Sequence, residues 1–124
     1  MKFLKNKSLG NSGEEIAKKY LEKKGLNYIT KNYRFHKKEI DLIFEDRKDN
    51  ILIFIEVKTR RSKTYGNPED SISALKRRNF KTAVNGFILE NPAYRNFSLR
   101  IDTIGIFIEG EKEPEINHIE NSFY

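Results

Sequence analysis

The segment Glu39–Arg60 constrains the fold of this chain more than any other, because it reads as two neighbouring strands that carry charges in their interiors. Residues Ile51–Ile55 are an unbroken apolar run, which is typical of a central strand covered on both faces. The polar run Asp46–Asn50 directly before it has the composition of a hairpin turn. The strand before this turn and the strand after it are therefore expected to lie side by side.

Charged side chains of the two strands are expected to meet on one face of this hairpin. Side chains alternate between the faces of a strand, so Glu39 shares a face with Asp41, and Glu56 shares a face with Lys58. When these two faces coincide, Asp41, Glu56 and Lys58 converge. A buried carboxylate is costly without a compensating partner, and two converging carboxylates also repel each other. A divalent cation such as Mg²⁺ relieves both costs, because hard cations prefer carboxylate oxygen.

A simpler interpretation is an ion pair between Glu56 and Lys58 at the end of a strand, which an isolated E-x-K pattern more often indicates. Asp41 favours the metal site, because an acid, a long interval and then E-x-K at the end of a buried strand is an arrangement found in nucleases. These residues by themselves leave both interpretations open.

Composition indicates one domain over residues 1–124 and a polyanionic partner. A chain of 124 residues with 37% apolar residues, nine Phe and six Tyr can fill one hydrophobic core. The net charge of +6 favours nucleic acid as the partner, with an ordinary soluble basic protein as the alternative. No cysteine is present, which excludes thiolate nucleophiles and cysteine zinc sites and fits a reducing compartment. No apolar stretch has the length of a signal peptide or a membrane span, so we expect a cytoplasmic protein.

A first helix is expected over residues 12–25, with Ser12 and Glu15 as a capping box. Its apolar face comprises Ile16, Ala17, Tyr20 and Leu21. On a helical wheel Glu15 points to solvent, whereas Glu14 lies at the rim of the apolar face. Glu14 is therefore placed to face the boundary of the core.

A second helix is expected over residues 68–89, with Asn67 as its N-cap and Pro68 as its first residue. Its inward stripe comprises Ile72, Leu75, Phe80, Ala83 and Phe87. Lys76 lies in the middle of this stripe and so points toward the sheet. It is either a snorkelling side chain with its ammonium at the edge of the helix or a partner for phosphate or for the carboxylates.

The remaining elements predict an α/β (α+β) fold in the order α-β-β-β-α-β with an added edge strand. The five strands are expected over residues 26–30, 38–45, 51–60, 97–108 and 116–119. The first three form an antiparallel meander, whereas the second helix makes the third and fourth strands parallel. The central sheet is therefore mixed and flanked by helices. Arg100 and Asp102 share one face of the fourth strand, and the helices and edge strands offer surfaces for a homodimer.

With these residues in place, the chain resembles the restriction-endonuclease-like PD-(D/E)XK superfamily, and more closely the bacterial YraN family, which is related to archaeal Holliday junction resolvases. The motifs that carry the resemblance are G-N-S-G-E-E-I-A at 10–17, K-N-Y-R at 31–34, E-I-D-L-I at 39–43, I-F-I-E-V-K-T-R at 53–60, Gly66 with Pro68 and Lys76, and R-I-D at 100–102. Lys38 departs from the pattern, because the family usually has Gly before E-I-D. The resemblance spans most of the chain and implies a restriction-endonuclease-like core.

The resemblance also implies a metal site. The acids that it assigns to a Mg²⁺ or Mn²⁺ ion are Glu14, Asp41 and Glu56. Asp41, Glu56 and Lys58 would be the catalytic residues, and Lys58 would orient water or offset developing negative charge. Lys76 is similar to the polar residue that the second helix contributes to such sites. Glu39, on the face of Asp41, either supports it or is a solvated charge at the start of its strand.

Basic residues around this region are candidates for contacts with a nucleic-acid backbone. They are Arg34, Arg60, Arg61, Lys63 and Arg77. Arg34 lies in K-N-Y-R-F-H-K-K, where interleaved aromatic and basic residues are typical of single-strand binding. We favour the interpretation that this segment is an exposed loop whose Tyr33 and Phe35 pack under the sheet. A solvated run of charge is the alternative for the other basic residues.

Two functions from different classes follow. The first is a metal-dependent endonuclease, which hydrolyses phosphodiester bonds of DNA rather than RNA and has branched, Holliday-junction-like DNA among its expected substrates. The alternative is a nucleic-acid-binding protein that keeps the nuclease fold without turnover; retention of the three acids and Lys58 favours the enzyme. A third interpretation, an interaction protein whose acids pair with Lys58 and Lys76, predicts no metal binding. Neither His36 nor His118 is needed for the chemistry, and His118 is expected to be structural or at the surface.

Overall fold

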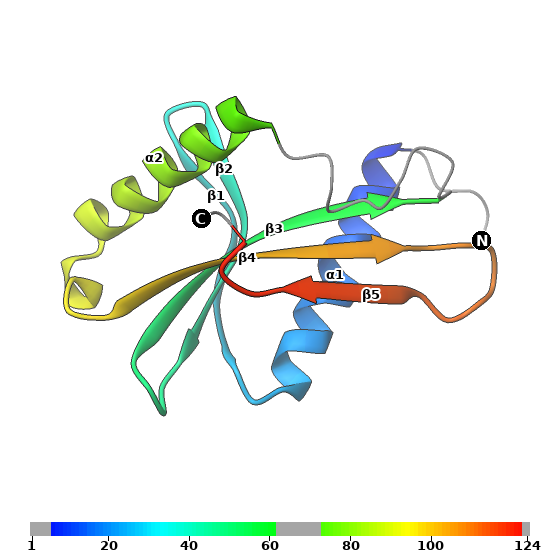
Figure 1. Ribbon diagram of the computed structural model, residues 1–124, viewed down its shortest axis with the longest axis horizontal. Coiled ribbons are helices and arrows are strands. Elements are labelled where there is room, and N and C mark those ends of the chain that lie inside the picture. Colours follow the sequence, from blue (N-terminus) through cyan, green and yellow to red (C-terminus); the bar gives the residue numbers. More distant parts are fainter. Residues whose placement is uncertain (1–5, 62–72, 123–124) are drawn as a thin grey trace.

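The helices and strands occur in the predicted order. The computed structural model describes residues 6–61 and 73–122. Its elements are helix α1 (Asn6–Lys23), strands β1 (Asn27–Phe35), β2 (Lys38–Asp46) and β3 (Ile51–Arg60), helix α2 (Ala74–Glu90), the 3₁₀ turn η2 (Pro92–Tyr94), and strands β4 (Ser98–Phe107) and β5 (Glu115–Ile119). This mixed α/β architecture confirms the expected fold class and is consistent with a restriction-endonuclease-like core (Figure 1).

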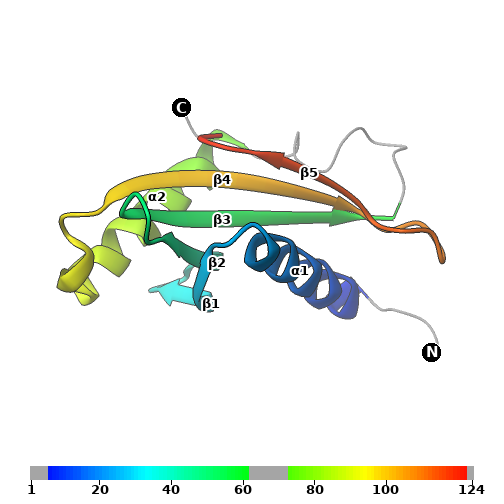
Figure 2. The same cartoon turned by 90° about the horizontal axis from the view of Figure 1, so that it is seen from below.

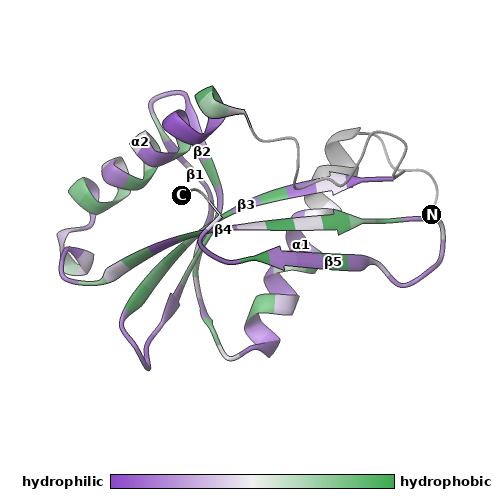
Figure 3. Ribbon diagram, viewed as in Figure 1, coloured by the Kyte–Doolittle hydropathy of each residue, from purple (hydrophilic) through white to green (hydrophobic). Residues whose placement is uncertain are grey.

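The five strands form one mixed sheet in the order β1-β2-β3-β4-β5. Neighbouring strands pair antiparallel except for β3 and β4, which are parallel from Ile51 opposite Ser98 to Arg60 opposite Phe107. The parallel pair follows from the crossover through α2, because a helix returns the chain to the end of the sheet from which it left. Figure 3 shows the hydrophobic colour of β3 giving way to hydrophilic colour toward its end, as the apolar run followed by charged residues predicts.

Two hydrophobic layers hold the helices on opposite faces of the sheet. Alternate residues of β3 divide between them, with Leu52 and Phe54 in the layer under α2 and Ile53 and Ile55 in the layer under α1. Figure 1 shows α1 behind strands β3 to β5 and α2 in front of the β1–β2 hairpin, and Figure 2 shows α1 lying along the strands. Both faces of β3 are therefore covered, as expected for a central strand.

Helix α1 packs its predicted apolar face on the sheet but begins earlier than predicted. The residues that line this face are the fully buried Ala17 and Leu21 and the partly buried Ile16 and Tyr20. The prediction that Ser12 caps the helix is wrong, because α1 begins at Asn6 and Ser12 lies inside it. Gly13 lies so close to β3 that an added Cβ would overlap Thr59 Oγ1. Gly13 directly follows Ser12, so α1 already packs against the sheet at the position where the capping signal occurs.

Strand β1 is longer than predicted. It runs to Phe35, so most of the segment 31–38 is an edge strand paired with β2, and the prediction of a loop there is wrong. A two-residue turn at His36 and Lys37 joins the strands, and His36 adopts a left-handed φ of 58°. Tyr33 and Phe35 pack against the layer under α2, as expected. Charged residues between these aromatic anchors obscure the strand pattern in the sequence.

Helix α2 begins later than predicted, at Ala74. Ser73 is its N-cap, and the Ser73 hydroxyl accepts a hydrogen bond from the backbone N–H of Lys76 at 3.1 Å. The residues of the predicted helix start that lie outside the described part of the chain are Asn67, Pro68 and Ile72. Neither α1 nor α2, as far as the described residues extend, is long and apolar enough to cross a membrane.

The inward stripe of α2 is confirmed at three positions and wrong at one. The buried positions are Phe80, Ala83 and Phe87. Leu75 is 60% exposed, because the first turn of α2 borders an open groove rather than the sheet. Gly86 allows the ring of Phe35 to lie against the helix backbone, since an added Cβ would overlap that ring. The stripe therefore makes contact with the sheet from the second turn of the helix onward.

Candidate active site

The sheet divides where β2 and β3 stop pairing. The two strands pair from Asp46 opposite Ile51 to Leu42 opposite Ile55. Past the Leu42 end of this ladder, β2 continues only with β1 and β3 continues only with β4. Figure 1 shows the β1–β2 hairpin turning away from β3. Beyond this point the backbones of β2 and β3 no longer form hydrogen bonds with each other. Polar side chains can therefore lie in the opening between the two strands.

Asp41 bridges the opening between the strands. Its Oδ2 accepts a hydrogen bond from the backbone N–H of Val57 at 2.8 Å, which replaces a ladder bond that the diverging strands no longer make. Glu14 reaches the same carboxyl group from α1 and is hydrogen-bonded to it. Because a hydrogen bond between two carboxyl groups needs a proton, one of this pair is protonated when no cation is bound. Glu14, Asp41 and Glu56 are together called the acid cluster below.

Glu56 is almost fully buried and is contacted by two lysines. Its side chain is 4% exposed, and its Oε2 lies 3.2 Å from Lys76 Nζ and 3.8 Å from Lys58 Nζ. Lys58 comes from the same face of β3, and Lys76 reaches down from α2, the direction that its place in the helix predicts. The charge of Glu56 is thus compensated by two ammonium groups.

Burial and mutual repulsion disturb the ionisation of the whole cluster. Burial, followed by the charge of Glu56, raises the pKa of Asp41 to about 8. Burial raises the pKa of Glu56 above its ordinary value, although Lys76 and Lys58 act in the opposite direction. Burial is also the main cause of the raised pKa of Glu14, and burial together with Lys76 lowers the pKa of Lys58. All three acids of the cluster thus have raised pKa values, a condition common in catalytic sites.

The donor set fits a divalent cation held by two carboxylates rather than by a complete protein cage. Across the described part of the chain, no group of three or more His, Cys, Asp or Glu side chains is arranged to hold a metal ion. Mg²⁺ is usually bound by one or two carboxylates, with waters and substrate phosphates as its other ligands. Asp41 and Glu56 offer such a pair. A cation would compete with the shared proton for Asp41 and with Lys76 for Glu56.

Glu39 lies at the rim of the acid cluster. It forms an ion pair with Arg34 of β1 at 3.6 Å. With its amide turned so that the nitrogen faces the acids, Asn32 donates to Glu39 Oε2 at 3.3 Å and to Glu14 Oε1 at 3.2 Å. Asn32, which has a left-handed φ of 52° within β1, was not predicted to belong to the site. The sequence does hold a hint: Asn32 is a polar residue, of a type that tolerates a left-handed φ, inside a strand otherwise rich in aromatic and basic residues.

The basic residues proposed to contact nucleic acid lie on several sides of the acid cluster. Those that the structure describes are Arg34, Arg60, Arg61 and Arg77, whereas Lys63 lies outside the described residues. Arg60 is partly buried and Arg61 is exposed, and both follow Lys58 at the end of β3. Arg34 borders the cluster on β1, and Arg77 is exposed on α2. The two arginines after Lys58 therefore extend the line of positive charge along β3.

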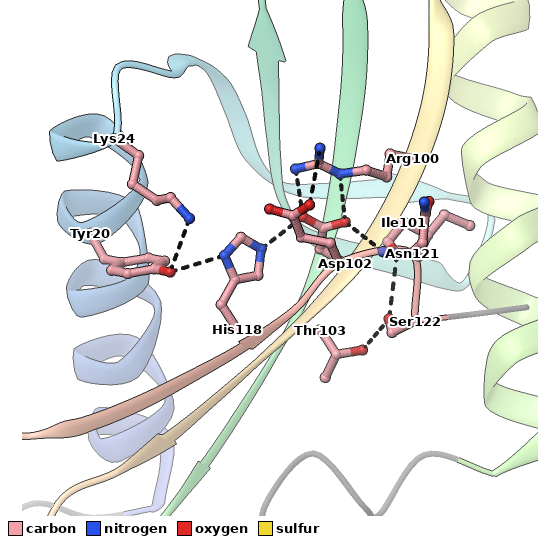
Figure 4. Close-up of polar contacts among 10 residues, drawn as sticks. Tyr20, Lys24, Arg100, Ile101, Asp102, Thr103, His118, Asn121 and Ser122 are labelled. Carbon is pink, nitrogen blue, oxygen red and sulfur yellow. Dashed lines mark hydrogen bonds and ion pairs between the residues drawn. The ribbon is translucent and has the colours of Figure 1, made fainter.

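A second polar network joins β5 to α1 on the other face of the sheet, and Figure 4 shows its members pointing toward one another. Asp102 is fully buried on β4, and its two oxygens accept hydrogen bonds from Arg100 Nε and Nη2 at 3.0 Å each. His118 Nε2 lies 2.8 Å from Asp102 Oδ2, and His118 Nδ1 lies 3.0 Å from Tyr20 Oη. Since an ionised carboxylate only accepts, Nε2 donates to Asp102, and in the neutral ring this leaves Nδ1 to accept from Tyr20.

The contacts of Asp102 within this network account for its ionisation. Burial opposes the charge of Asp102, but hydrogen bonds from His118 and Arg100 outweigh burial and hold the pKa of Asp102 below its ordinary value. The shared face of Arg100 and Asp102 was predicted from the alternation of side chains along β4, but their partners Tyr20 and His118 were not predicted. Tyr20 and His118 are separated by 98 residues, and the pairing depends on the register that sets His118 opposite Ile104.

The chain matches one protein family over most of its length. The profile of the uncharacterised protein family UPF0102 matches residues 13–106, a span that contains the whole acid cluster. A UPF0102 protein of Natranaerobius thermophilus is 39% identical over 121 residues, which cover 97% of this chain and 100% of the relative. UPF0102 proteins of Flavobacterium psychrophilum and Syntrophomonas wolfei are each 38% identical, over 94% and 95% of this chain and 93% and 99% of the relatives. The chain therefore belongs to the UPF0102 family, which is the YraN family that its motifs predict.

Proposed function

We propose that this protein is a metal-dependent endonuclease that hydrolyses phosphodiester bonds of DNA, with branched, Holliday-junction-like DNA among its substrates. The observation that carries the proposal is the meeting of Asp41, Glu56 and Lys58 where β2 and β3 separate, beside Glu14 of α1. Acids with raised pKa values and a neighbouring lysine are the groups that phosphodiester hydrolysis uses. The net charge of +6 supports a polyanionic substrate, and the absence of cysteine supports a cytoplasmic site of action.

The residues of the site have distinct roles in the proposed reaction. Asp41 and Glu56 would hold a divalent cation, which would supply Lewis acidity for phosphodiester hydrolysis. Lys58, 3.8 Å from Glu56, orients that water or offsets negative charge that develops on the phosphoryl oxygens. Lys76 compensates Glu56 from α2, and Glu14 accepts the hydrogen bond from Asp41, whose raised pKa keeps the shared proton on Asp41 until a cation displaces it.

A nucleic-acid-binding protein without turnover is the second candidate, and one contact favours it. Lys76 Nζ lies 3.2 Å from Glu56 Oε2, so Glu56 already has a cationic partner without any metal. An acid cluster balanced by lysines can be retained for structure alone. In that case the protein binds DNA, and divalent metals change neither its stability nor the DNA.

Cleavage of labelled DNA tests the proposed function. Four-way-junction, duplex and single-stranded DNA are incubated with wild type and with the Asp41→Asn, Glu56→Gln and Lys58→Met variants, in Mg²⁺, in Mn²⁺ and in EDTA. We expect metal-dependent cutting by wild type and a loss of about 100-fold or more in each variant, because each change removes a group from the reacting centre. Glu15→Gln is the matched control, since Glu15 is the exposed neighbour of Glu14 in α1.

The outcomes separate the two candidates. Cutting by wild type and Glu15→Gln, lost in the site variants, supports the endonuclease. DNA binding without cutting in either metal supports the binding protein. Cutting that survives in both Asp41→Asn and Glu56→Gln contradicts the assignment of the site.

A further inference from the structure

A groove lined by lysines opens directly beside the acid cluster. It has a volume of about 340 Å³ and lies between the β1–β2 turn and the first turns of α2. Lys37 and Lys38 line it from the turn, and Lys76 and Asn79 line it from the helix. Lys76 also contacts Glu56 at 3.2 Å, so this lysine groove and the candidate active site share one side chain.

The described lining of the lysine groove carries more positive than negative charge. Among its described lining residues only Glu39 is acidic, and Glu39 is paired with Arg34 at 3.6 Å. No acidic side chain within residues 6–61 and 73–122 forms an ion pair with Lys37 or Lys38. Within the described residues the ammonium groups of Lys37 and Lys38 therefore have no ion-pair partner, and they can attract an anion.

Neutral groups in the same wall suit the backbone of a nucleic acid. The Ser73 hydroxyl accepts a hydrogen bond from Lys76 N, which leaves its own proton to donate to a ligand. Asn79 adds an amide to the wall, and the 60% exposed Leu75 adds an apolar surface for a sugar ring. Ammonium, hydroxyl and amide groups are the usual partners of backbone phosphates, and they select no base.

We propose that the lysine groove binds a backbone phosphate of a DNA strand, close to the phosphate that is presented to Asp41 and Glu56. The inference rests on the proposed function, because it takes DNA as the ligand of the adjoining site. A phosphate held there fixes the position of the strand without reading its sequence, which is how backbone contacts set register. The alternative is that Lys37 and Lys38 are solvated charges that attract DNA only diffusely.

The salt dependence of DNA binding tests this inference without any cleavage. Anisotropy of fluorescein-labelled four-way-junction and duplex DNA is measured in EDTA over a series of salt concentrations. The groove variant is Lys37→Ala/Lys38→Ala. The matched control is Lys19→Ala/Lys23→Ala, which removes the same charge from α1, where both lysines line a different groove. Equal thermal unfolding midpoints establish that both variants are folded.

We expect the groove variant to lose one phosphate contact. The slope of log K against log salt should then become shallower by about 0.7–0.9, and affinity should fall about five- to tenfold. The control variant should keep the slope of wild type. Lys37→Arg/Lys38→Arg should restore both the slope and the affinity, since arginine also binds phosphate.

The measurements distinguish a wrong assignment of the phosphate site from a wrong assignment of nuclease activity. A slope unchanged by Lys37→Ala/Lys38→Ala overturns the groove as a phosphate site, even if the DNA is cut. A shallower slope without cutting in Mg²⁺ or Mn²⁺ supports the groove and counts against the nuclease. Wild-type protein that binds no DNA overturns both.

Discussion

Asp41 of β2 and Val57 of β3 are joined by a hydrogen bond of 2.8 Å, from the backbone N–H of Val57 to Oδ2 of Asp41. The last backbone pair of these strands is Leu42 opposite Ile55, so the side chain spans a gap that the ladder no longer closes. Asp41 thus satisfies a backbone donor of β3 and also brings a carboxylate close enough to Glu56 for the charge of Glu56 to raise the pKa of Asp41. An asparagine would keep the first contact and remove the charge.

Asp41→Asn should therefore stabilise the metal-free protein in alkaline solution. The pKa of Asp41 is about 8 in the folded protein and about 4 in an unfolded chain, so folding disfavours its ionised form. This cost is absent below the unfolded pKa, grows as the pH rises, and is complete above the folded pKa. We expect Asp41→Asn to gain about 1–3 kcal/mol in unfolding free energy near pH 9 and nothing near pH 4. Thermal and urea unfolding in EDTA measure the difference.

The exposed Glu15 supplies the control for this pH dependence. Glu15→Gln removes the same charge from a solvated position and should follow the wild-type curve across the whole pH range. An Asp41→Asn protein that is less stable than wild type near pH 9 would contradict this account, because it would show that the ionised carboxylate stabilises the fold.

Asp102→Asn should destabilise the protein by about 3–5 kcal/mol near neutral pH, because it removes a buried charge that holds both Arg100 and His118. Glu120→Gln is the comparison. Glu120 also pairs with Arg100, at 3.6 Å, but its side chain is 54% exposed, so its loss should cost less than about 1 kcal/mol. Urea unfolding of the two variants tests the ranking, and equal losses would contradict the structural role of Asp102.

At acidic pH the difference in unfolding free energy between wild type and Asp102→Asn should disappear. The pKa of Asp102 is lowered on folding, so its stabilising contribution is complete above the unfolded pKa of about 3.9 and is lost as the pH falls through the folded pKa. Unfolding free energies of both proteins should therefore converge as the pH falls from about 3.9 through the folded pKa of Asp102. A difference that stays constant through this range would mean that the loss comes from packing alone.

Gly13→Ala should push α1 away from β3. Alanine gains up to about 1 kcal/mol of helix propensity, but its Cβ overlaps Thr59 Oγ1, and overpacking of this kind costs about 1–3 kcal/mol. Thr59→Ala in the same protein should restore part of the loss, with a coupling energy of about 0.5–3 kcal/mol in a double-mutant cycle. If the changes in unfolding free energy of the two substitutions are strictly additive, the overlap with Thr59 is not the cause of the loss in Gly13→Ala.

Short-range periodicity was enough to predict the central part of the fold. The apolar run of β3, bounded by a polar turn and by charged residues, gave its limits correctly as Ile51–Arg60. Alternation of side chains placed Asp41 on the face from which it reaches β3, and the helical wheel pointed Lys76 toward the sheet. Each of these inferences depends only on neighbours within one element or across one hairpin.

Features that depend on distant contacts could not be predicted in the same way. Ser12 has the sequence signal of an N-cap, but it lies inside α1. The next residue, Gly13, already packs against Thr59 of β3, a contact that no local pattern predicts. Asn32 bridges Glu14 and Glu39 only because α1 lies beside the end of β1. The bond from His118 to Asp102 requires the register of β5 on β4, which no local pattern sets.

Calorimetric titration with Mn²⁺ tests most directly whether Asp41 and Glu56 together hold a divalent cation. Wild type and Glu15→Gln should bind Mn²⁺ near pH 7, whereas Asp41→Asn and Glu56→Gln should lose about tenfold or more in affinity. Since the pKa of Asp41 is about 8, binding should also release a proton, seen as a heat that varies with the ionisation enthalpy of the buffer. Equal Mn²⁺ affinity in wild type and Asp41→Asn, with no proton released, would contradict the proposed metal site.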